Sequence, residues 1–135
     1  DKTKVIDVKQ PGITLDFLGF SMRYDRDLHG RSHRYLNTFP SVKAVKRHRD
    51  KLRELTSSGY KKSLRAIINE VNEKNRSWKS YFQIGYPRKC FRDVDYFILK
   101  RFKSLINHRS QRKCRPLKQG ESLYAGIRRL GYIPL

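Results

Sequence analysis

The stretch N-E-K-N-R-S-W-K-S-Y-F, residues Asn72 to Phe82, decides the fold of this chain. It contains the only tryptophan, Trp78, and it ends a run of apolar positions that starts at Leu64 and repeats at three- and four-residue steps. This spacing is typical of one face of an α-helix. With Ser63 as an N-cap, the pattern predicts a single helix that runs to Phe82 and places Trp78 and Phe82 in a core.

The same period predicts helices on either side of this stretch. One helix is expected to start after Ser41, its N-cap, and to end near Gly59, which can adopt the left-handed conformation common at helix ends. A third apolar stripe runs from Phe91 to Leu105, and residues 122–130 predict a short fourth helix. We expect these helices to form a bundle whose core includes five side chains: Leu52, Ile68, Trp78, Phe82 and Ile98.

The first 40 residues show strand-like patterns in place of helical spacing. Residues 4–8, a turn at residues 10–12 and an apolar run from Ile13 to Tyr24 predict a hairpin or a pair of strands, and Arg34 to Phe39 predicts one more strand. Gly19 indicates a bulge or the close approach of another group. The predicted class is therefore α+β: a short β-hairpin or strand segment followed by a mainly helical bundle of three to four helices.

The charge of the chain indicates a polyanionic partner. Among 135 residues, 32 Lys and Arg stand against 12 Asp and Glu, which gives a net charge of +20 spread along the whole sequence. A folded domain with this charge repels itself unless a polyanion neutralises it, and nucleic acid is the leading candidate. Membrane binding is the weaker interpretation, because no apolar run approaches the roughly 20 residues of a spanning helix.

Cations and one aromatic residue supply the candidate binding surface. Five cations occupy the face of the first helix that is opposite its apolar stripe, and Arg76 and Lys79 lie off the Trp78 stripe. Such a density of cations exceeds what solubility requires, and phosphate contact is the interpretation we favour over a solvated surface. The predicted RNA-binding residues are Lys43, Lys46, Arg47, Arg53, Lys62, Arg65, Arg76, Lys79 and Tyr81.

No catalytic or metal-binding residue is predicted in the chain. Cys90 and Cys114 are the only cysteines, and neither stands at a zinc-like spacing from a histidine, so we expect a reduced intracellular protein without a metal site. Asp93 and Asp95 are two residues apart on a helix and so point to different faces, which is poor geometry for paired acid-base work. Walker, Rossmann and Ser-His-Asp patterns are missing from the sequence.

Several motifs occur in an order that is familiar. They are K-T-K at Lys2 to Lys4, F-L-G-F at Phe17 to Phe20, P-S before a basic helix, N-x-x-x-R-x-W-x-x-Y-F at Asn72 to Phe82, D-x-x-I at Asp95 and a terminal L-G-Y at Leu130 to Tyr132. Over nearly the whole chain this order resembles the C-terminal part of group II intron reverse transcriptase–maturases. The family usually has Arg-Gly-Trp where this chain has Arg76-Ser77-Trp78, which keeps a small residue between the other two.

The resemblance implies a division of the chain into two parts. Residues 1–40 would be the last strands of the reverse transcriptase palm, and 41–135 would be the thumb, or maturase-specific X domain. The sequence begins in mid-pattern with Asp1, as expected of a piece of a larger protein. The primer-grip turn, which presents the primer end, would consist of Phe17, Leu18, Gly19 and Phe20.

The resemblance also implies activity and partners. The parent protein would be an RNA-directed DNA polymerase that uses Mg²⁺, whereas this fragment lacks the Y-A-D-D-like aspartate motif, needs no cofactor and is expected to bind without polymerising. Its partners would be the group II intron RNA, whose splicing it assists, and the template-primer RNA/DNA duplex. The family allows a homo-oligomer formed through the parent protein. The expected location is the cytoplasm of a bacterial host, or an organelle.

Two other functions compete with this interpretation. A DNA-binding module of a recombinase or homing factor would use a helix in the major groove, although the predicted helices are longer than those of a helix-turn-helix. A structural RNA-packing protein is compatible with the composition. The β segment with F-L-G-F at Phe17 to Phe20 argues against the RNA-packing protein, because an independent RNA-binding domain has no need of a hairpin that begins in mid-sheet.

Overall fold

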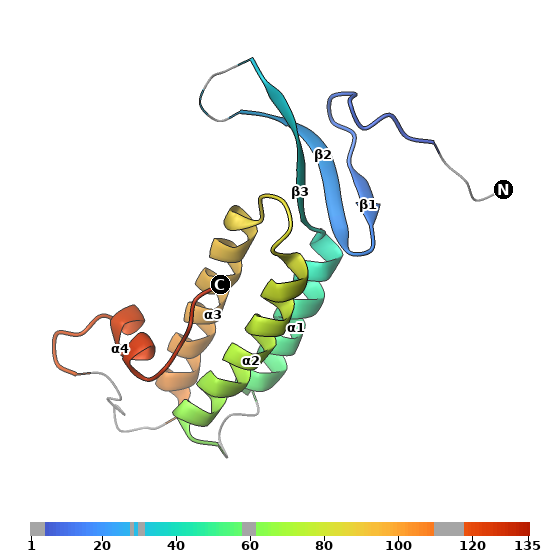
Figure 1. Ribbon diagram of the computed structural model, residues 1–135. Coiled ribbons are helices and arrows are strands. Elements are labelled where there is room, and N and C mark those ends of the chain that lie inside the picture. The colour runs from blue at the N-terminus through green and yellow to red at the C-terminus, as the bar shows by residue number, and fades with distance from the viewer. Residues whose placement is uncertain (1–4, 28, 30–31, 58–61, 110–117) are drawn as a thin grey trace.

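A three-stranded sheet stands at one end of a group of helices in the computed structural model of the chain (Figure 1). The structure describes residues 5–27, 29, 32–57, 62–109 and 118–135. The α+β class predicted from the sequence is confirmed. In chain order the elements are β1 (Leu15–Phe17), β2 (Phe20–Arg26), β3 (Arg34–Pro40), α1 (Val42–Ser57), α2 (Leu64–Phe82), α3 (Arg88–His108) and α4 (Leu123–Arg129).

The sheet is antiparallel in the order β1-β2-β3, and the strand predicted at Arg34 to Phe39 is confirmed as β3. Phe17 pairs with Phe20, so only Leu18 and Gly19 separate β1 from β2. The hairpin turn therefore lies at Leu18-Gly19, within the turn that the family resemblance placed at residues 17–20. The chain also turns at residues 10–12 as predicted, where the Ile13 N–H donates to the Gln10 carbonyl at 3.4 Å, but the strand predicted just before this turn is wrong for residues 5–8. Both sides of β2 are already paired, and residues 5–8 form no strand.

Local capping chemistry fixes where α1 and α2 begin. The Ser41 hydroxyl accepts a hydrogen bond from the Ala44 backbone N–H at 3.2 Å, and the Ser63 hydroxyl accepts one from the Ala66 N–H at 3.1 Å. Each bond satisfies an N–H of the first turn that has no partner within the helix. Both predicted N-caps are thus confirmed, whereas Gly59, the predicted C-terminal residue of α1, lies outside the described residues.

The hydrophobic core lies between the helices. Leu52 of α1, Ile68 of α2 and Ile98 of α3 are buried in it, and Phe82 is buried at the end of α2 that is nearer the sheet. Trp78 is partly buried and packs against the same cluster. The predicted fourth helix is present as α4, and its Ile127 is fully buried in this core.

Two polar side chains, one on α2 and one on α3, form hydrogen bonds with the last five residues. The Asp95 carboxylate accepts hydrogen bonds from the Tyr132 hydroxyl at 2.5 Å and from the Leu135 backbone N–H at 3.1 Å. The Asn72 side chain donates to the Gly131 carbonyl at 2.7 Å and accepts from the Ile133 N–H at 3.0 Å. These contacts hold the C-terminal segment across the helices, as Figure 1 shows.

Close backbone contacts dock the sheet onto the helices. The Ser41 N–H donates to the Gly19 carbonyl at 2.8 Å, and the Tyr86 N–H donates to the Thr38 carbonyl at 3.0 Å. At Gly85, which has φ +80°, a Cβ atom would lie 2.4 Å from the Thr38 carbonyl oxygen, so only glycine allows this approach. At Gly19 a Cβ would touch the Phe82 ring at 3.4 Å, which accords with the close approach predicted there.

Candidate nucleic-acid interface

A cluster of aromatic rings sets the position of α2, the helix that carries several of the candidate cations. The Trp78 indole stacks on the His48 imidazole of α1 with ring centroids 4.5 Å apart, and it also contacts Phe82 and Phe91. Next to this stack, His48 Nε2 donates a buried hydrogen bond to Asn75 Oδ1 at 3.0 Å. Trp78 thus connects all three long helices and orients the outer side of α2.

The nine side chains predicted to bind RNA are all exposed. On α1, Lys43 and Arg47 lie opposite the buried positions His48, Leu52 and Thr56, because a helix turns by about 100° per residue. Lys46 and Arg53 lie on one flank of the same helix, between the buried and the opposite faces. On α2, Arg65 and Arg76 are close to three full turns apart and so share one flank of the helix. The structure therefore presents the candidate cations as two basic surfaces, one on α1 and one on α2.

Two of the eight candidate cations are engaged in ion pairs. Arg53 pairs with Asp50 on the same helix, and Lys62 pairs with Glu70 at 2.5 Å. Exposed pairs of this kind contribute little stability, but the neighbouring carboxylate offsets the charge that a phosphate would meet. Within the described part of the chain, no salt bridge is formed by the other six cations, which are Lys43, Lys46, Arg47, Arg65, Arg76 and Lys79.

Tyr81, the aromatic member of the predicted set, is attached to the hairpin turn. Its hydroxyl donates a hydrogen bond to the Leu18 carbonyl at 3.0 Å, and its ring stacks on Phe20 at 5.4 Å. The side chain remains about half exposed. In this arrangement Tyr81 joins the end of α2 to the β1–β2 turn, so the turn and the basic surface of α2 are held in a fixed relation.

The predicted primer-grip turn has an unusual backbone. Leu18 has a φ of 49° and Gly19 a φ of 85°, as a type I′ turn requires. A leucine in this region carries a conformational cost of about 1–2 kcal/mol. The strained turn presents Phe17 and Leu18 to solvent, with exposed fractions of 59% and 70%, and their neighbour Phe20 packs against Phe82.

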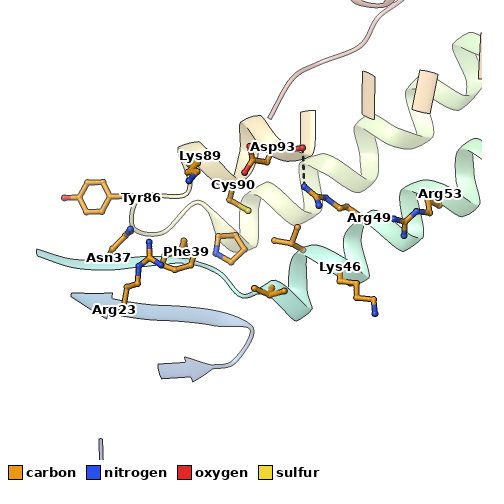
Figure 2. A pocket seen from close by; sticks show the side chains of 13 residues that line it. Arg23, Asn37, Phe39, Lys46, Arg49, Arg53, Tyr86, Lys89, Cys90 and Asp93 are labelled. Atoms are coloured by element: carbon orange, nitrogen blue, oxygen red, sulfur yellow. Dashed lines mark hydrogen bonds between the residues drawn. The ribbon is translucent and has the colours of Figure 1, made fainter. Parts of the chain in front are cut away.

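A cavity of about 590 Å³ lies between the sheet and the helices, and Figure 2 shows the side chains around it. The sequence did not predict this feature or the role of three cations that line it: Arg23 of β2, Arg49 of α1 and Lys89 of α3. Lys46 and Arg53 of the predicted set also line it. The wall between the cations is largely apolar and aromatic, and it includes Phe39, Pro40, Val42, Val45 and Tyr86.

The polar groups of the cavity are only partly satisfied. Arg49 donates to the Asp93 carbonyl at 3.4 Å and lies over the Phe97 ring, yet its Nε is buried with no hydrogen-bond partner among the described residues. The same holds for Asn37 Oδ1. Burial, with a smaller contribution from Asp93, raises the pKa of the Cys90 thiol to about 11, so this side chain stays protonated.

The acidic side chains serve structural roles. Asp95 anchors the C-terminal segment by accepting hydrogen bonds from Tyr132 and Leu135. Across the described ranges, no group of three His, Cys, Asp or Glu side chains is placed to hold a metal ion such as Mg²⁺, and Cys114 lies outside those ranges. None of the helices in the described residues is long and apolar enough to cross a membrane.

The cavity escaped prediction because its walls come from separate segments. Arg23 and Asn37 lie on different strands, and Lys89 belongs to a helix far along the chain from both. The one available signal was the position of Arg49, which interrupts the apolar stripe of α1 where a hydrophobic residue is expected. A cation on such a stripe indicates a polar site between elements.

Comparison with known proteins places the helical part of the chain in a family. A family model described as the group II intron, maturase-specific domain matches residues 45–122, more than half of the chain. A search among curated proteins gave no match. The matched segment begins within α1, covers α2 and α3, and includes the Asn72 to Phe82 stretch and every candidate cation except Lys43. The chain belongs to the group II intron maturase-specific domain family and functions in intron splicing with the intron RNA as its partner.

Proposed function

We propose that the exposed cations of α1 and α2 bind the phosphate backbone of the folded group II intron RNA. The observation that carries this proposal is the set of six candidate cations, among them Lys43, Arg47 and Arg76, that are exposed and form no salt bridge within the described residues. Each can neutralise a phosphate and release the counterions condensed there. Arg53 and Lys62 contribute less, since each already faces a carboxylate.

Such binding assists splicing without catalysis by the protein. Packing RNA helices together brings phosphates close to each other, and a rigid basic surface lowers the repulsion between them. A-form RNA is recognised through its shape and backbone, because its deep, narrow major groove does not admit side chains. The rigidity comes from Trp78 and His48, which hold α1 and α2 in a fixed relation.

The template-primer duplex is a second proposed ligand of the same protein. The support for it is the strained turn at Leu18, whose side chain and that of Phe17 project into solvent while Tyr81 and Ser41 hold the turn in place. We assign residues 1–40 to the end of a palm and residues 41–135 to a thumb. Magnesium-dependent polymerisation would belong to a parent protein, as the family resemblance implies.

Charge reversal tests the RNA-binding proposal. One variant replaces the six candidate cations that form no salt bridge with Glu: Lys43, Lys46, Arg47, Arg65, Arg76 and Lys79. A matched variant carries the same net change on exposed cations elsewhere: Arg88, Arg92, Lys100, Lys103, Lys118 and Arg128. Affinity for a group II intron RNA is measured against salt concentration for both.

The proposal predicts that the first variant binds more weakly and has the flatter salt dependence. The slope of log K against log salt should fall by up to about 0.9 for each phosphate that the variant no longer neutralises. An equal loss of RNA affinity in the two variants would show that binding depends only on net charge. It would refute the assignment of the phosphate contacts to α1 and α2. Duplex DNA serves as a competitor at matched salt, and a preference for DNA over intron RNA would favour a DNA-binding module.

A further inference from the structure

We infer that the cavity between the sheet and helices α1 and α3 accepts one unstacked nucleotide of the bound RNA. The inference rests on the proposed RNA-binding function and goes beyond it, because phosphate contacts on open helix surfaces require no cavity. It assigns a role to Arg23, Asn37 and Lys89, which lie outside the basic surfaces of α1 and α2. The occupant would be a base that has left its helical stack, such as a bulged nucleotide.

The size and lining of the cavity suit a nucleobase. Its volume of about 590 Å³ falls within the range of roughly 300–1,000 Å³ that is usual for small-ligand sites. In Figure 2, Tyr86, Phe39 and Arg23 lie toward one end. The Arg23 guanidinium covers the Phe39 ring at 5.0 Å, and Tyr86 is 62% exposed. Aromatic rings and guanidinium planes are the surfaces on which unstacked bases are bound.

The opposite end of the cavity supplies positive charge. Lys46, Arg49 and Arg53 lie toward that end in Figure 2, whereas Lys89 of α3 lies nearer the aromatic end. Among the described residues that line the cavity, Asp93 is the only acidic one. A nucleotide combines an apolar π-face with an anionic phosphate, and this cavity combines aromatic rings at one end with cations at both ends. A purely apolar peptide segment would leave the cations without partners, and a bare phosphate would leave the aromatic end empty.

Two polar side-chain atoms of the lining also have no hydrogen-bond partner within the part of the chain that the structure describes. Asn37 donates through its Nδ2 to Asp25 at 2.6 Å, which fixes the orientation of the amide and leaves its Oδ1 as a buried acceptor with no donor among the described residues. Arg49 Nε is a buried donor that likewise has no acceptor among the described residues. Buried groups of this kind are costly, and the edge of a base carries both donors and acceptors of the kinds that these two atoms require.

Three labelled RNA hairpins of the same sequence test the inference on the full chain. One has a continuous stem, one carries a single bulged adenosine, and one carries an abasic nucleotide at the bulge. Binding at fixed salt is measured by fluorescence anisotropy. We expect the adenosine bulge to bind about tenfold more tightly than the other two, which corresponds to the lower part of the range for stacking one base on an aromatic side chain.

Matched variants locate the effect. Tyr86→Ala removes an exposed ring from the cavity rim, and Tyr96→Ala removes an equally exposed ring of α3 outside it. Val42→Trp narrows the cavity from an exposed position, and Val5→Trp makes the same exchange away from it. Tyr86→Ala and Val42→Trp should abolish most of the preference for the adenosine bulge, whereas the two controls should retain it.

The outcomes separate this inference from the proposed function. Equal affinity for the three hairpins would overturn the nucleotide site and leave backbone binding intact, and so would a preference that Tyr86→Ala and Val42→Trp leave unchanged. Equal affinity for the three hairpins is also the result expected if a segment of a parent protein, and not a nucleotide, fills the cavity. Tight binding of the abasic bulge would show that a bent backbone is recognised and not a base. Failure to bind any hairpin would overturn both proposals.

Discussion

The imidazole ring of His48 lies flat against the indole ring of Trp78, with the centroids 4.5 Å apart and the planes 6° from parallel. His48 is on α1 and Trp78 on α2, so this stack joins the two helices that carry the candidate RNA-binding cations. Phe91 of α3 meets the same indole at 5.6 Å. The position of both basic surfaces therefore depends on one aromatic side chain.

Replacing Trp78 should lower the stability of the fold. Trp78→Ala removes the ring that contacts His48, Phe82 and Phe91, and we expect the free energy of unfolding to fall by about 3 kcal/mol, the lower end for such truncations because the ring is only partly buried. Equilibrium unfolding in denaturant measures this change in the free energy of unfolding. Trp78→Phe, which keeps an aromatic ring, should cost clearly less, and equal costs would contradict a role based on ring contacts.

The buried position of His48 should make stability depend on pH. Burial lowers the pKa of His48 below its usual value of 6.5, and the hydrogen bond to Asn75 offsets this only in part. The unfolded chain therefore takes up a proton more readily than the folded chain, so stability falls as pH drops below about 6.5. The free energy of unfolding should decline more steeply for the wild type than for His48→Gln over this window. Parallel curves would show that His48 does not contribute.

Two cations on α2 should affect RNA binding without affecting the fold. Arg76 and Lys79 are exposed and lie off the buried stripe of α2, so the double Ala variant should unfold within about 0.5 kcal/mol of the wild type. Its intron RNA affinity should fall, with a flatter dependence on salt.

Lys62→Ala provides a comparison for these two cations, because Glu70 already offsets the Lys62 charge. Its affinity for the RNA should fall less than that of Arg76→Ala or Lys79→Ala alone. If Lys62→Ala weakened binding as much as either, ion pairing would not distinguish the binding cations from the others.

Gly85 should tolerate no side chain. Gly85→Ala would bring a Cβ atom to 2.4 Å from the Thr38 carbonyl oxygen, in addition to the cost of alanine at φ +80°. Gly12 has a similar φ of +85° with nothing within 4 Å of the added atom, so Gly12→Ala isolates the conformational cost, about 1–2 kcal/mol. We expect Gly85→Ala to lower the melting temperature well beyond Gly12→Ala. Similar melting temperatures for the two variants would mean that the backbone around Gly85 and Thr38 can shift at little cost to accommodate the added Cβ atom.

The sequence by itself determined the helices and the nature of the partner. A stripe such as Leu64 to Phe82 and a cap such as Ser63 act within one or two turns of the chain, so their geometry can be read from spacing alone. Net charge is a sum over the sequence and needs no fold, which is why +20 already indicated a polyanion.

The tertiary structure decided the backbone geometry of the hairpin turn, whose place only the family resemblance had indicated, and it alone formed the cavity. Leucine disfavours positive φ, so local preference argues against a turn at Leu18; the turn is held there by Tyr81, 63 residues away, and by Ser41. The cavity likewise forms only when distant elements pack together, because its lining includes Arg23 of β2 and Lys89 of α3.

In the Asn72 to Phe82 stretch, spacing already placed Trp78 on the core side of the helix and Arg76 off that side. The structure added the partner of the indole ring, which is His48 on α1. Contacts between distant segments leave no periodic signal in the chain, because they depend on how whole elements pack, and only the folded structure reveals them.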